Sequence, residues 1–469
     1  MQSAVCRRGI EPGRIRLNTI NRAPTAVDAT RGLHRILIVG GGAGGLPLAV
    51  RLGETLGKRR RAEITLVDRY ATHLWKPLLH EVAAGRMDGE AHGVDYLALA
   101  HWHGFRFRLG AVADLDRHER MLGLAAVQDD DGREMLPRRR VAYDTLVFAV
   151  GSISNDFGIP GVAAHAMSLD TAADAERFHR RLLAACVRAD ARAAQGARAT
   201  VDIVIVGAGA TGVELAAEIR QMTRVHAGYG LDHLDAARDI RLTLVEAAPR
   251  ILPPLIERIA VAAAGLLADL DVVVRTGVKV TGIDDEGVHT VGGELIPADL
   301  IVWTAGIQAP PWLAQMAGLE VNRANQLIVD TRLVTTRDPD IFAFGDCAAC
   351  PWPEAGKPGA IVPPRAQTAH QQSALLVHSL TARLAGGPLR EYRYRDFGSL
   401  VSLGAVSAVG SLMGRLVGGT LFIEGLVARW TYAALYKQHQ VSVHGYYRVL
   451  LDTLGRFLRR RLEPRVKLH

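Results

Sequence analysis

Two parts of the chain show the same order of apolar and polar positions. In each, a short apolar run leads directly into a glycine-rich loop, at residues 36–45 and at residues 201–212. A helix-like stretch follows each loop, and a second apolar run then ends in an acid, Asp68 in one case and Glu246 in the other. Short apolar runs bounded by glycine are typical of strands buried in a parallel sheet. The order strand, loop, helix and strand therefore predicts two βαβ units and an α/β fold.

The glycines of both loops have the spacing of a dinucleotide-binding fingerprint. The first glycine permits a tight turn, the second lets the backbone approach a pyrophosphate, and the third lets the next helix pack closely. The N–H groups at the start of that helix then face the phosphates. The residues that we expect at the two pyrophosphates are Gly40, Gly42, Ala43 and Gly45 in the first loop, and Gly207, Gly209, Thr211 and Gly212 in the second.

The acids that end the second strands predict the other half of each nucleotide site. Asp68 and Glu246 stand where a carboxylate accepts hydrogen bonds from ribose hydroxyls. Glu246 would also repel a 2′-phosphate, which favours NADH over NADPH. Two such units predict two adenine dinucleotides, the arrangement of a flavoprotein that moves electrons from a nicotinamide to a bound flavin. The alternative, two unrelated glycine turns at the surface, requires the same order of elements to arise twice by chance.

A further strand signal ends at Gly345 and Asp346, which places a carboxylate where it suits a polyhydroxyl chain such as ribityl. The turn signals then divide the chain into five parts. We expect a basic, disordered extension at 1–33, the two parts of an FAD-binding domain at 34–165 and 300–375, and an NADH-binding domain with a helical lead-in at 166–299. Residues 376–469 should form a C-terminal quinone and membrane-surface region with an amphipathic helix. The predicted fold class is therefore two Rossmann-like domains with a C-terminal membrane-associating region.

The clearest helical periodicity lies near the C-terminus, in residues 443–458. Arginines fall on one face, and the apolar stripe opposite consists of Val443, Tyr447, Leu450, Leu451, Leu454, Phe457 and Leu458. Because residues 425–469 carry nine basic side chains against two acids, we expect residues 443–461 to lie on an anionic lipid surface. The alternatives are a helix packed on the protein's own sheet or on a twin subunit, so a homodimer stays open. The uncharged residues 397–414 are rich in glycine and serine and predict short strands, so we expect no membrane span and no proton pumping.

Composition narrows the class of protein. Of 469 residues, 49% are hydrophobic and 22% are charged, which is the balance of a globular chain. Four cysteines provide no disulfide framework and fit a reducing compartment. Cys347 and Cys350 have the spacing of a redox pair, and a catalytic dithiol is one interpretation of them. We instead expect two buried thiols, and no metal site, because a zinc site would require a second pair of cysteines. No segment resembles a nucleic-acid-binding module, and we expect no nucleic acid partner.

Several blocks of sequence resemble the type II NADH:quinone dehydrogenases, which are single-subunit respiratory enzymes. The specific blocks are Trp75-Lys-Pro and Pro363-Pro-Arg-Ala-Gln367, since the glycine loops are shared across the wider superfamily of flavoproteins with two dinucleotides. The resemblance covers most of residues 34–450. It implies an oxidoreductase that passes a hydride from NADH to bound FAD and then two electrons to a membrane quinone.

The resemblance also implies roles for particular residues. FAD would lie on the first loop, with Asp68 at its adenosine ribose, Lys76 near the isoalloxazine, and Gly345 and Asp346 at the ribityl chain. NADH would lie on the second loop and at Glu246, with its nicotinamide reaching the flavin past Glu214 and Gly306.

Three polar residues are the catalytic candidates. The resemblance places Gln367 and Gln371 in the quinone pocket and Glu214 beside the nicotinamide. The two glutamines are four residues apart and so share a helix face, and an amide can donate to a quinone carbonyl without adding charge. Their alternative role is surface polarity or a contact to the backbone. The alternative for Glu214 is compensation of a helix dipole, since it follows the second loop closely.

The same resemblance places the protein peripherally on the cytoplasmic face of the bacterial inner membrane. A mitochondrial membrane is the alternative, because the arginine-rich residues 1–33 could form a transit peptide. Three other functions stay open. A disulfide reductase requires a cysteine pair near residues 70–90, where there is none, and a sulfide:quinone reductase requires cysteines beside the flavin. A redox-sensing flavoprotein would bind both nucleotides with little turnover.

Overall fold

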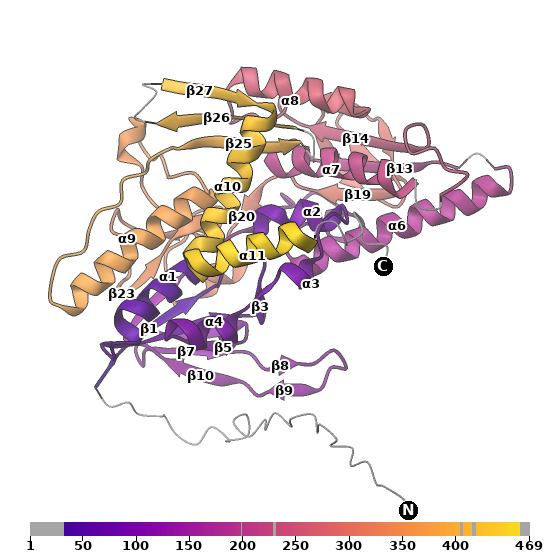
Figure 1. Cartoon of the computed structure of the whole chain (residues 1–469). Helices are drawn as coiled ribbons and strands as arrows, with labels where there is room; N and C mark the ends of the chain where they lie inside the picture. Colours follow the sequence, from indigo (N-terminus) through magenta and orange to yellow (C-terminus); the bar gives the residue numbers. More distant parts are fainter. Residues whose placement is uncertain (1–31, 198, 228–230, 404–406, 415–418, 460–469) are drawn as a thin grey trace, which may run out of the picture. The chain divides into compact units, whose positions relative to one another are not determined.

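The computed structural model describes residues 32–197, 199–227, 231–403, 407–414 and 419–459. The chain divides into two units, Met1–Leu33 and His34–His469. The basic extension predicted at residues 1–33 lies, apart from its last two residues, outside the described part. The helices and strands below all belong to the second unit (Figure 1).

A six-stranded sheet is built around β1 (His34–Val39), the strand that precedes the first glycine loop (Figure 1). β1 pairs in parallel with β2 (Ala62–Asp68) on one side and with β11 (Thr145–Phe148) on the other. The order is β22-β23-β11-β1-β2-β5, where the outer strands are β5 (Arg106–Leu109), β22 (Val334–Thr335) and β23 (Asp338–Ala343). The chain therefore returns to its first sheet after the second glycine loop.

A four-stranded parallel sheet surrounds the second loop. Its order is β15-β14-β13-β19, formed by β13 (Val201–Val206), β14 (Ile240–Glu246), β15 (Val272–Thr276) and β19 (Leu300–Trp303). β2 and β14 both end at the acid that the pattern placed there. The strand that leads into each loop is buried along most of its length in an apolar core. Both βαβ units and the α/β class are therefore confirmed.

The helices after the two loops are α1 (Gly45–Leu52) and α7 (Ala210–Ala227). A long helix, α9 (Ala366–Leu384), packs along α1. α6 (Ala172–Ala194) begins where the hydroxyl of Thr171 accepts a hydrogen bond from the Asp174 N–H. The other helices of the nucleotide-binding part are α2 (Leu79–Ala83), α3 (Gly89–His92), α4 (Tyr96–His103), α5 (Val162–His165) and α8 (Glu257–Asp269).

Short strands complete the same part of the chain in small sheets. β3 (Thr72–His73) pairs with β4 (Val94–Asp95), and β12 (Ile153–Ser154) pairs with β20 (Ile307–Gln308). One three-stranded sheet contains β6 (Val112–Asp116), β7 (Met121–Leu124) and β10 (Arg139–Ala142), and β8 (Val127–Gln128) pairs with β9 (Glu134–Leu136). Another three-stranded sheet contains β16 (Val280–Ile283), β17 (Gly287–Thr290) and β18 (Leu295–Pro297), and β21 (Leu327–Ile328) pairs with β24 (Ala348–Ala349).

The C-terminal region forms an antiparallel sheet followed by two helices. The strands are β25 (Gly398–Leu403), β26 (Ser407–Gly414) and β27 (Gly419–Glu424), so the glycine- and serine-rich segment does form strands. Among the described residues, no helix combines the length and the apolar character that a membrane crossing requires. The helices are α10 (Gly425–His444) and α11 (Tyr446–Arg459).

The boundary between these two helices corrects the predicted C-terminal helix. Gly445 has φ of +77°, a conformation that ends one helix and lets the next begin. Val443 therefore belongs to α10 and is buried in the main core, and it is not part of the apolar stripe. Among the described side chains of α11, the exposed apolar ones are Tyr446, Tyr447, Leu450, Leu451 and Leu454, while those of Phe457 and Leu458 lie outside the described part.

Candidate active site

The first glycine loop has the shape that a pyrophosphate site requires. Gly40 has φ of +100°, and a Cβ there would lie 2.4 Å from the carbonyl oxygen of Ala149. A Cβ on Gly45 would lie 1.9 Å from the carbonyl oxygen of Gly40. At Gly42, in contrast, a Cβ would meet no atom within 4 Å. The protein itself therefore excludes a side chain from the first and third glycines, while the second faces open space from which a ligand can approach the backbone.

The second loop repeats this arrangement. Gly207 has φ of +106°, and a Cβ there would lie 2.6 Å from the backbone nitrogen of Ala305. A Cβ on Gly212 would lie 2.0 Å from the carbonyl oxygen of Gly207, and one on Gly209 would meet nothing within 4 Å. Both loops thus fit a dinucleotide.

The strand-end acids are tied to their own loops. One carboxylate oxygen of Asp68 accepts a hydrogen bond from the Gly41 N–H at 2.7 Å, and the other accepts from the Tyr70 N–H at 2.9 Å. Glu246 accepts from the N–H groups of Ala208 and Ala248, both at 2.8 Å. Burial raises the pKa of Asp68, and the two backbone hydrogen bonds partly offset this. These contacts hold each acid beside its glycine loop, and ribose binding stays a prediction.

One cavity of about 2010 Å³ connects the two loops. A pocket for one small ligand usually measures about 300–1,000 Å³, so this cavity has room for more than one. The predicted site residues that line it are Gly40, Gly42, Ala43, Asp68, Lys76, Gly209, Thr211, Glu214, Gly345, Asp346, Gln367 and Gln371. The predicted site residues that do not line it are Gly45, Gly207, Gly212, Glu246 and Gly306.

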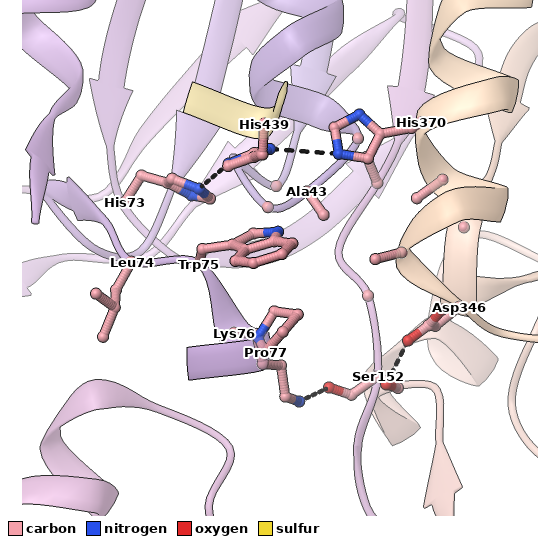
Figure 2. Close-up of a pocket in the computed structure, with 18 of the residues that line it drawn as sticks. Ala43, His73, Leu74, Trp75, Lys76, Pro77, Ser152, Asp346, His370 and His439 are labelled. Carbon is pink, nitrogen blue, oxygen red and sulfur yellow. Dashed lines mark hydrogen bonds between the residues drawn. The ribbon is translucent and has the colours of Figure 1, made fainter. Parts of the chain in front are cut away.

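Lys76 and Asp346 lie on one wall of this cavity, linked through Ser152 (Figure 2). The Lys76 ammonium donates to the Ser152 carbonyl oxygen at 2.9 Å and pairs with Asp170 at 3.2 Å. The Ser152 hydroxyl donates to the Asp346 carboxylate at 2.8 Å. Burial raises the pKa of Asp346, while this hydroxyl and Lys76 lower it. Cation, hydroxyl and carboxylate therefore form a polar row that suits a polyhydroxyl chain.

Gly306 directly precedes β20 and lies against Phe157. It has φ of +74°, and a Cβ there would lie 2.3 Å from the Phe157 ring. Phe157 is exposed and has φ of +53°, which is rare for a bulky residue. The glycine thus permits close approach of an aromatic ring.

Gln367 and Gln371 lie on α9 and line the cavity, but both amides already bind the segment before β25. The Gln367 amide N–H groups reach the Asp396 carboxylate and the Gly398 carbonyl, both at 3.2 Å. The Gln371 amide nitrogen donates to the Arg395 carbonyl at 2.7 Å. Since an amide has two N–H donors, the contacts among the described residues leave Gln371 one N–H for a ligand and Gln367 none. The alternative role as a backbone contact is therefore present in the structure for both residues.

Glu214 lies beyond the first turn of α7 and is buried at the junction with α2. It accepts a hydrogen bond from the Ser402 N–H at 3.0 Å, and its other oxygen lies 3.6 Å from Nδ1 of His80. Burial raises the pKa of Glu214 to about 8, and burial with nearby Arg86 lowers that of His80 to about 3. The contact between them is therefore polar and not an ion pair. Glu214 holds a proton at neutral pH, a property that dipole compensation does not require.

Several residues in or behind the cavity wall were not foreseen from the sequence. Gln372 is buried behind the cavity lining, and its amide oxygen accepts from the Gly345 N–H at 2.8 Å, which holds the loop that carries Asp346. Trp75 stacks with Tyr436 and with His439 of α10, with ring centroids 5.4 Å and 5.3 Å away, and Figure 2 shows the Trp75 and His439 rings. Its indole N–H is buried and has no partner among the described residues. The repeated glutamine after Gln371 and the aromatic residue before Lys76 were the available signals.

The two cysteines with redox spacing are not placed for thiol chemistry. Cys347 and Cys350 are buried and are not joined by a disulfide. Burial raises the pKa of Cys347 to about 11 and that of Cys350 to about 12, so neither forms a thiolate near neutral pH. No cluster of metal-ligating side chains occurs in the part of the chain that the structure describes.

Comparison with known proteins agrees with this geometry. The family model for pyridine nucleotide-disulphide oxidoreductases matches residues 34–373. The type II NADH:quinone oxidoreductase of Haemophilus influenzae is 40% identical over 449 residues, covering 93% of this chain and 100% of the relative. The solved structure of NDH2 from Plasmodium falciparum with NADH has a TM-score of 0.76 at 17% identity, covering 92% of this chain and 100% of that one.

A second solved structure marks how widely the fold is shared. The sulfide:quinone oxidoreductase of Aquifex aeolicus has a TM-score of 0.67 at 18% identity, covering 92% of this chain and 96% of that one. At these identities the two structures establish only the fold, whereas the Haemophilus relative establishes the family. The geometry agrees with that assignment, because the second glycine of each loop faces open space, the second strand of each unit ends in an acid, and one cavity reaches both loops. The chain belongs to the type II NADH:quinone oxidoreductases of the pyridine nucleotide-disulphide oxidoreductase family.

Proposed function

We propose that this protein oxidises NADH and passes two electrons through bound FAD to a membrane quinone, without pumping protons. The single observation that supports it most is the cavity that joins the two glycine loops. FAD, when bound, supplies the ring chemistry that accepts a hydride and hands electrons on. The protein supplies binding, orientation and exclusion of water.

The first loop and the polar row would hold FAD. Gly42 leaves the approach to the pyrophosphate open, Asp68 lies beside the loop for the adenosine ribose, and Asp346 faces the cavity for the ribityl hydroxyls. Ser152 and Lys76 would position Asp346 by the hydrogen bond and charge described above.

The second loop would hold NADH in the same way. Gly209 faces the cavity for the pyrophosphate, and Glu246 favours a free 2′-hydroxyl over a phosphate. Gly306 does not line the cavity, so its role beside the nicotinamide rests on the resemblance and on the close approach of Phe157 that its φ of +74° permits. Glu214 lines the cavity and is protonated at neutral pH, so it can hold a proton beside the reacting rings.

Gln371 would meet the quinone. Its remaining amide N–H can donate to a quinone carbonyl, while Gln367 fixes the segment that forms the wall. This division of roles refines the expectation that both amides contact the ring.

The exposed apolar face of α11 would meet an anionic bilayer. Five of its apolar side chains are between 58% and 84% exposed. α4 adds exposed Leu97 and Trp102, and the Arg448 guanidinium lies 4.0 Å over the Trp102 ring. An exposed apolar face beside basic groups favours attachment to the cytoplasmic face of a bacterial inner membrane. The alternative is that a second copy of this chain covers the same face of α11 in a homodimer.

Steady-state turnover of the purified, FAD-loaded protein tests the proposal. We expect NADH oxidation that depends on a short-chain quinone and does not occur with disulfide substrates, and we expect no quinone reduction when sulfide replaces NADH. The buried Cys347 and Cys350 give no reason to expect thiol chemistry. Turnover with sulfide and quinone in the absence of NADH would contradict the proposal, as would nucleotide binding without turnover.

A further inference from the structure

The segment 247–256 connects the end of β14 to the start of α8 (Figure 1). Leu252, Pro254 and Leu255 line the cavity together with the second glycine loop. The Leu252 N–H donates to the carbonyl oxygen of Ala208, in that loop, at 2.8 Å. The segment therefore forms a wall directly beside the loop that we assign to NADH.

The backbone of this wall has few means of holding its own shape. Pro253 and Pro254 have no N–H groups to donate. One backbone hydrogen bond, from the Leu255 N–H to the Leu252 carbonyl oxygen at 2.9 Å, closes a turn. Leu252 has φ of +49°, which is rare for a bulky residue and persists only where the surroundings hold it. The wall therefore needs support from a side chain.

Arg250 supplies this support. Its Nη2 donates to the carbonyl oxygens of Pro253 and Leu255, both at 2.8 Å, and its Nη1 lies 3.5 Å from the carbonyl oxygen of Leu252. A guanidinium is planar and holds its N–H groups at fixed angles, so it also fixes the carbonyls that it binds relative to one another. Arg250 itself does not line the cavity, so its effect on a ligand passes through the wall.

We propose that Arg250 is a positioning residue of the NADH site, because its guanidinium holds residues 252–255 as a preformed wall against which the nucleotide packs at the second glycine loop. A wall that is already ordered spares the nucleotide the entropic cost of ordering it on binding. The proposal rests on the proposed function for the identity of the nucleotide.

This role differs from a direct charge contact. If Arg250 attracted the pyrophosphate by its charge alone, a lysine would serve nearly as well. A lysine ammonium is a point charge on a flexible stem, and it does not reproduce the planar fork that binds the Pro253 and Leu255 carbonyls. Arg250→Lys and Arg250→Gln should therefore weaken nucleotide binding alike.

Hydrogen–deuterium exchange of the FAD-loaded protein, without nucleotide, tests the wall itself. The N–H groups of Leu252 and Leu255 are both hydrogen-bonded, so the peptide that contains them reports on the segment. In Arg250→Gln this peptide should exchange at least ~5-fold faster, because the loss of the guanidinium contacts favours local opening. Peptides from β13 should keep their rates. An unchanged rate in the 247–256 peptide would overturn the proposal.

Anaerobic stopped-flow bleaching of the flavin by NADH separates binding from chemistry. Arg250→Gln and Arg250→Lys should each raise Kd for NADH by roughly 5- to 30-fold, as expected from the loss of one or two net hydrogen bonds, and should leave the limiting rate of bleaching unchanged. Arg241→Gln, which removes an exposed ion pair with Asp202, is the matched control on β14 and should leave Kd unchanged. Wild-type affinity in Arg250→Lys would refute the proposal, since charge would then suffice.

Titration calorimetry with NAD⁺ keeps this proposal distinct from the proposed function, because NAD⁺ has no hydride to give to the flavin. NAD⁺ affinity should fall in Arg250→Gln by the same factor as NADH affinity. If it does so in a protein whose flavin NADH cannot bleach, only the proposed function is refuted. Equal NAD⁺ affinity in wild type and Arg250→Gln would refute the role of Arg250.

Discussion

Replacing Gly209 by alanine separates nucleotide binding from folding. Its φ lies outside the left-handed region, and the new Cβ would meet nothing within 4 Å. The apo protein should therefore fold normally, and it can gain about 0.4–1 kcal/mol because the unfolded chain loses freedom. The methyl group would, however, fill the space through which a pyrophosphate approaches the backbone. Overfilling a close contact costs about 1–3 kcal/mol, so Kd for NADH should rise roughly 5- to 150-fold.

Anaerobic stopped-flow reduction of the yellow protein over a range of NADH concentrations measures this Kd, and thermal unfolding measures stability. Gly209→Ala should keep its FAD and its Tm while binding NADH weakly. Gly42→Ala is the matched change in the first loop and should instead weaken FAD retention. Gly212→Ala, whose Cβ would lie 2.0 Å from the Gly207 carbonyl oxygen, should lower Tm as well. Unchanged NADH binding in Gly209→Ala would refute the role of the open glycine, and so would a Tm that falls as far as in Gly212→Ala.

Three further predictions follow from the buried acid, the amides and the exposed helix. Because the pKa of Glu214 is raised, the unfolded state binds fewer protons than the folded state between about pH 4.5 and 8, so stability falls as pH rises through this window. Glu214→Gln should flatten this fall in thermal melts, and an unchanged pH profile of Tm would contradict the assignment. Gln371→Leu should raise KM for quinone by roughly 5-fold because one N–H donor is lost, with little change in the reduction of the flavin by NADH. Equal KM values for wild type and variant in steady-state assays would show that Gln371 does not contact the quinone. The double change Leu450→Asp and Leu454→Asp should reduce co-sedimentation with anionic vesicles at least ~10-fold without changing NADH oxidation by a soluble acceptor. A shift from dimer to monomer in light scattering would instead indicate that this face of α11 packs against a second subunit.

The parts of the fold that the sequence predicts best are those that depend on local pattern. β13 begins at Val201, as the apolar run indicated, and β2 and β14 end at Asp68 and Glu246. Strict glycine spacing carries this information because steric exclusion acts within a few residues. The C-terminal helix was misplaced because periodicity continues across Gly445, where the backbone turns but the apolar pattern does not break.

The rest of the site depends on contacts between distant segments, which no local pattern encodes. The contacts among His73, His370 and His439 join β3, α9 and α10, and only tertiary structure brings these rings together. For the same reason the sequence could not tell that Gln367 uses both amide hydrogens on the segment before β25. The sequence showed which residues have side chains that could contact a nucleotide or a quinone. The tertiary structure decides which of these side chains keep a free hydrogen-bond donor or acceptor.

Double-mixing stopped-flow measures the central claim most directly. Anaerobic FAD-loaded protein is mixed with NADH, aged until the flavin absorbance bleaches, and then mixed with a short-chain quinone. The account predicts rapid bleaching by NADH, much slower bleaching by NADPH, and recovery of the yellow colour on adding quinone. Flavin that NADH does not bleach, or bleached flavin that quinone does not reoxidise, would contradict it.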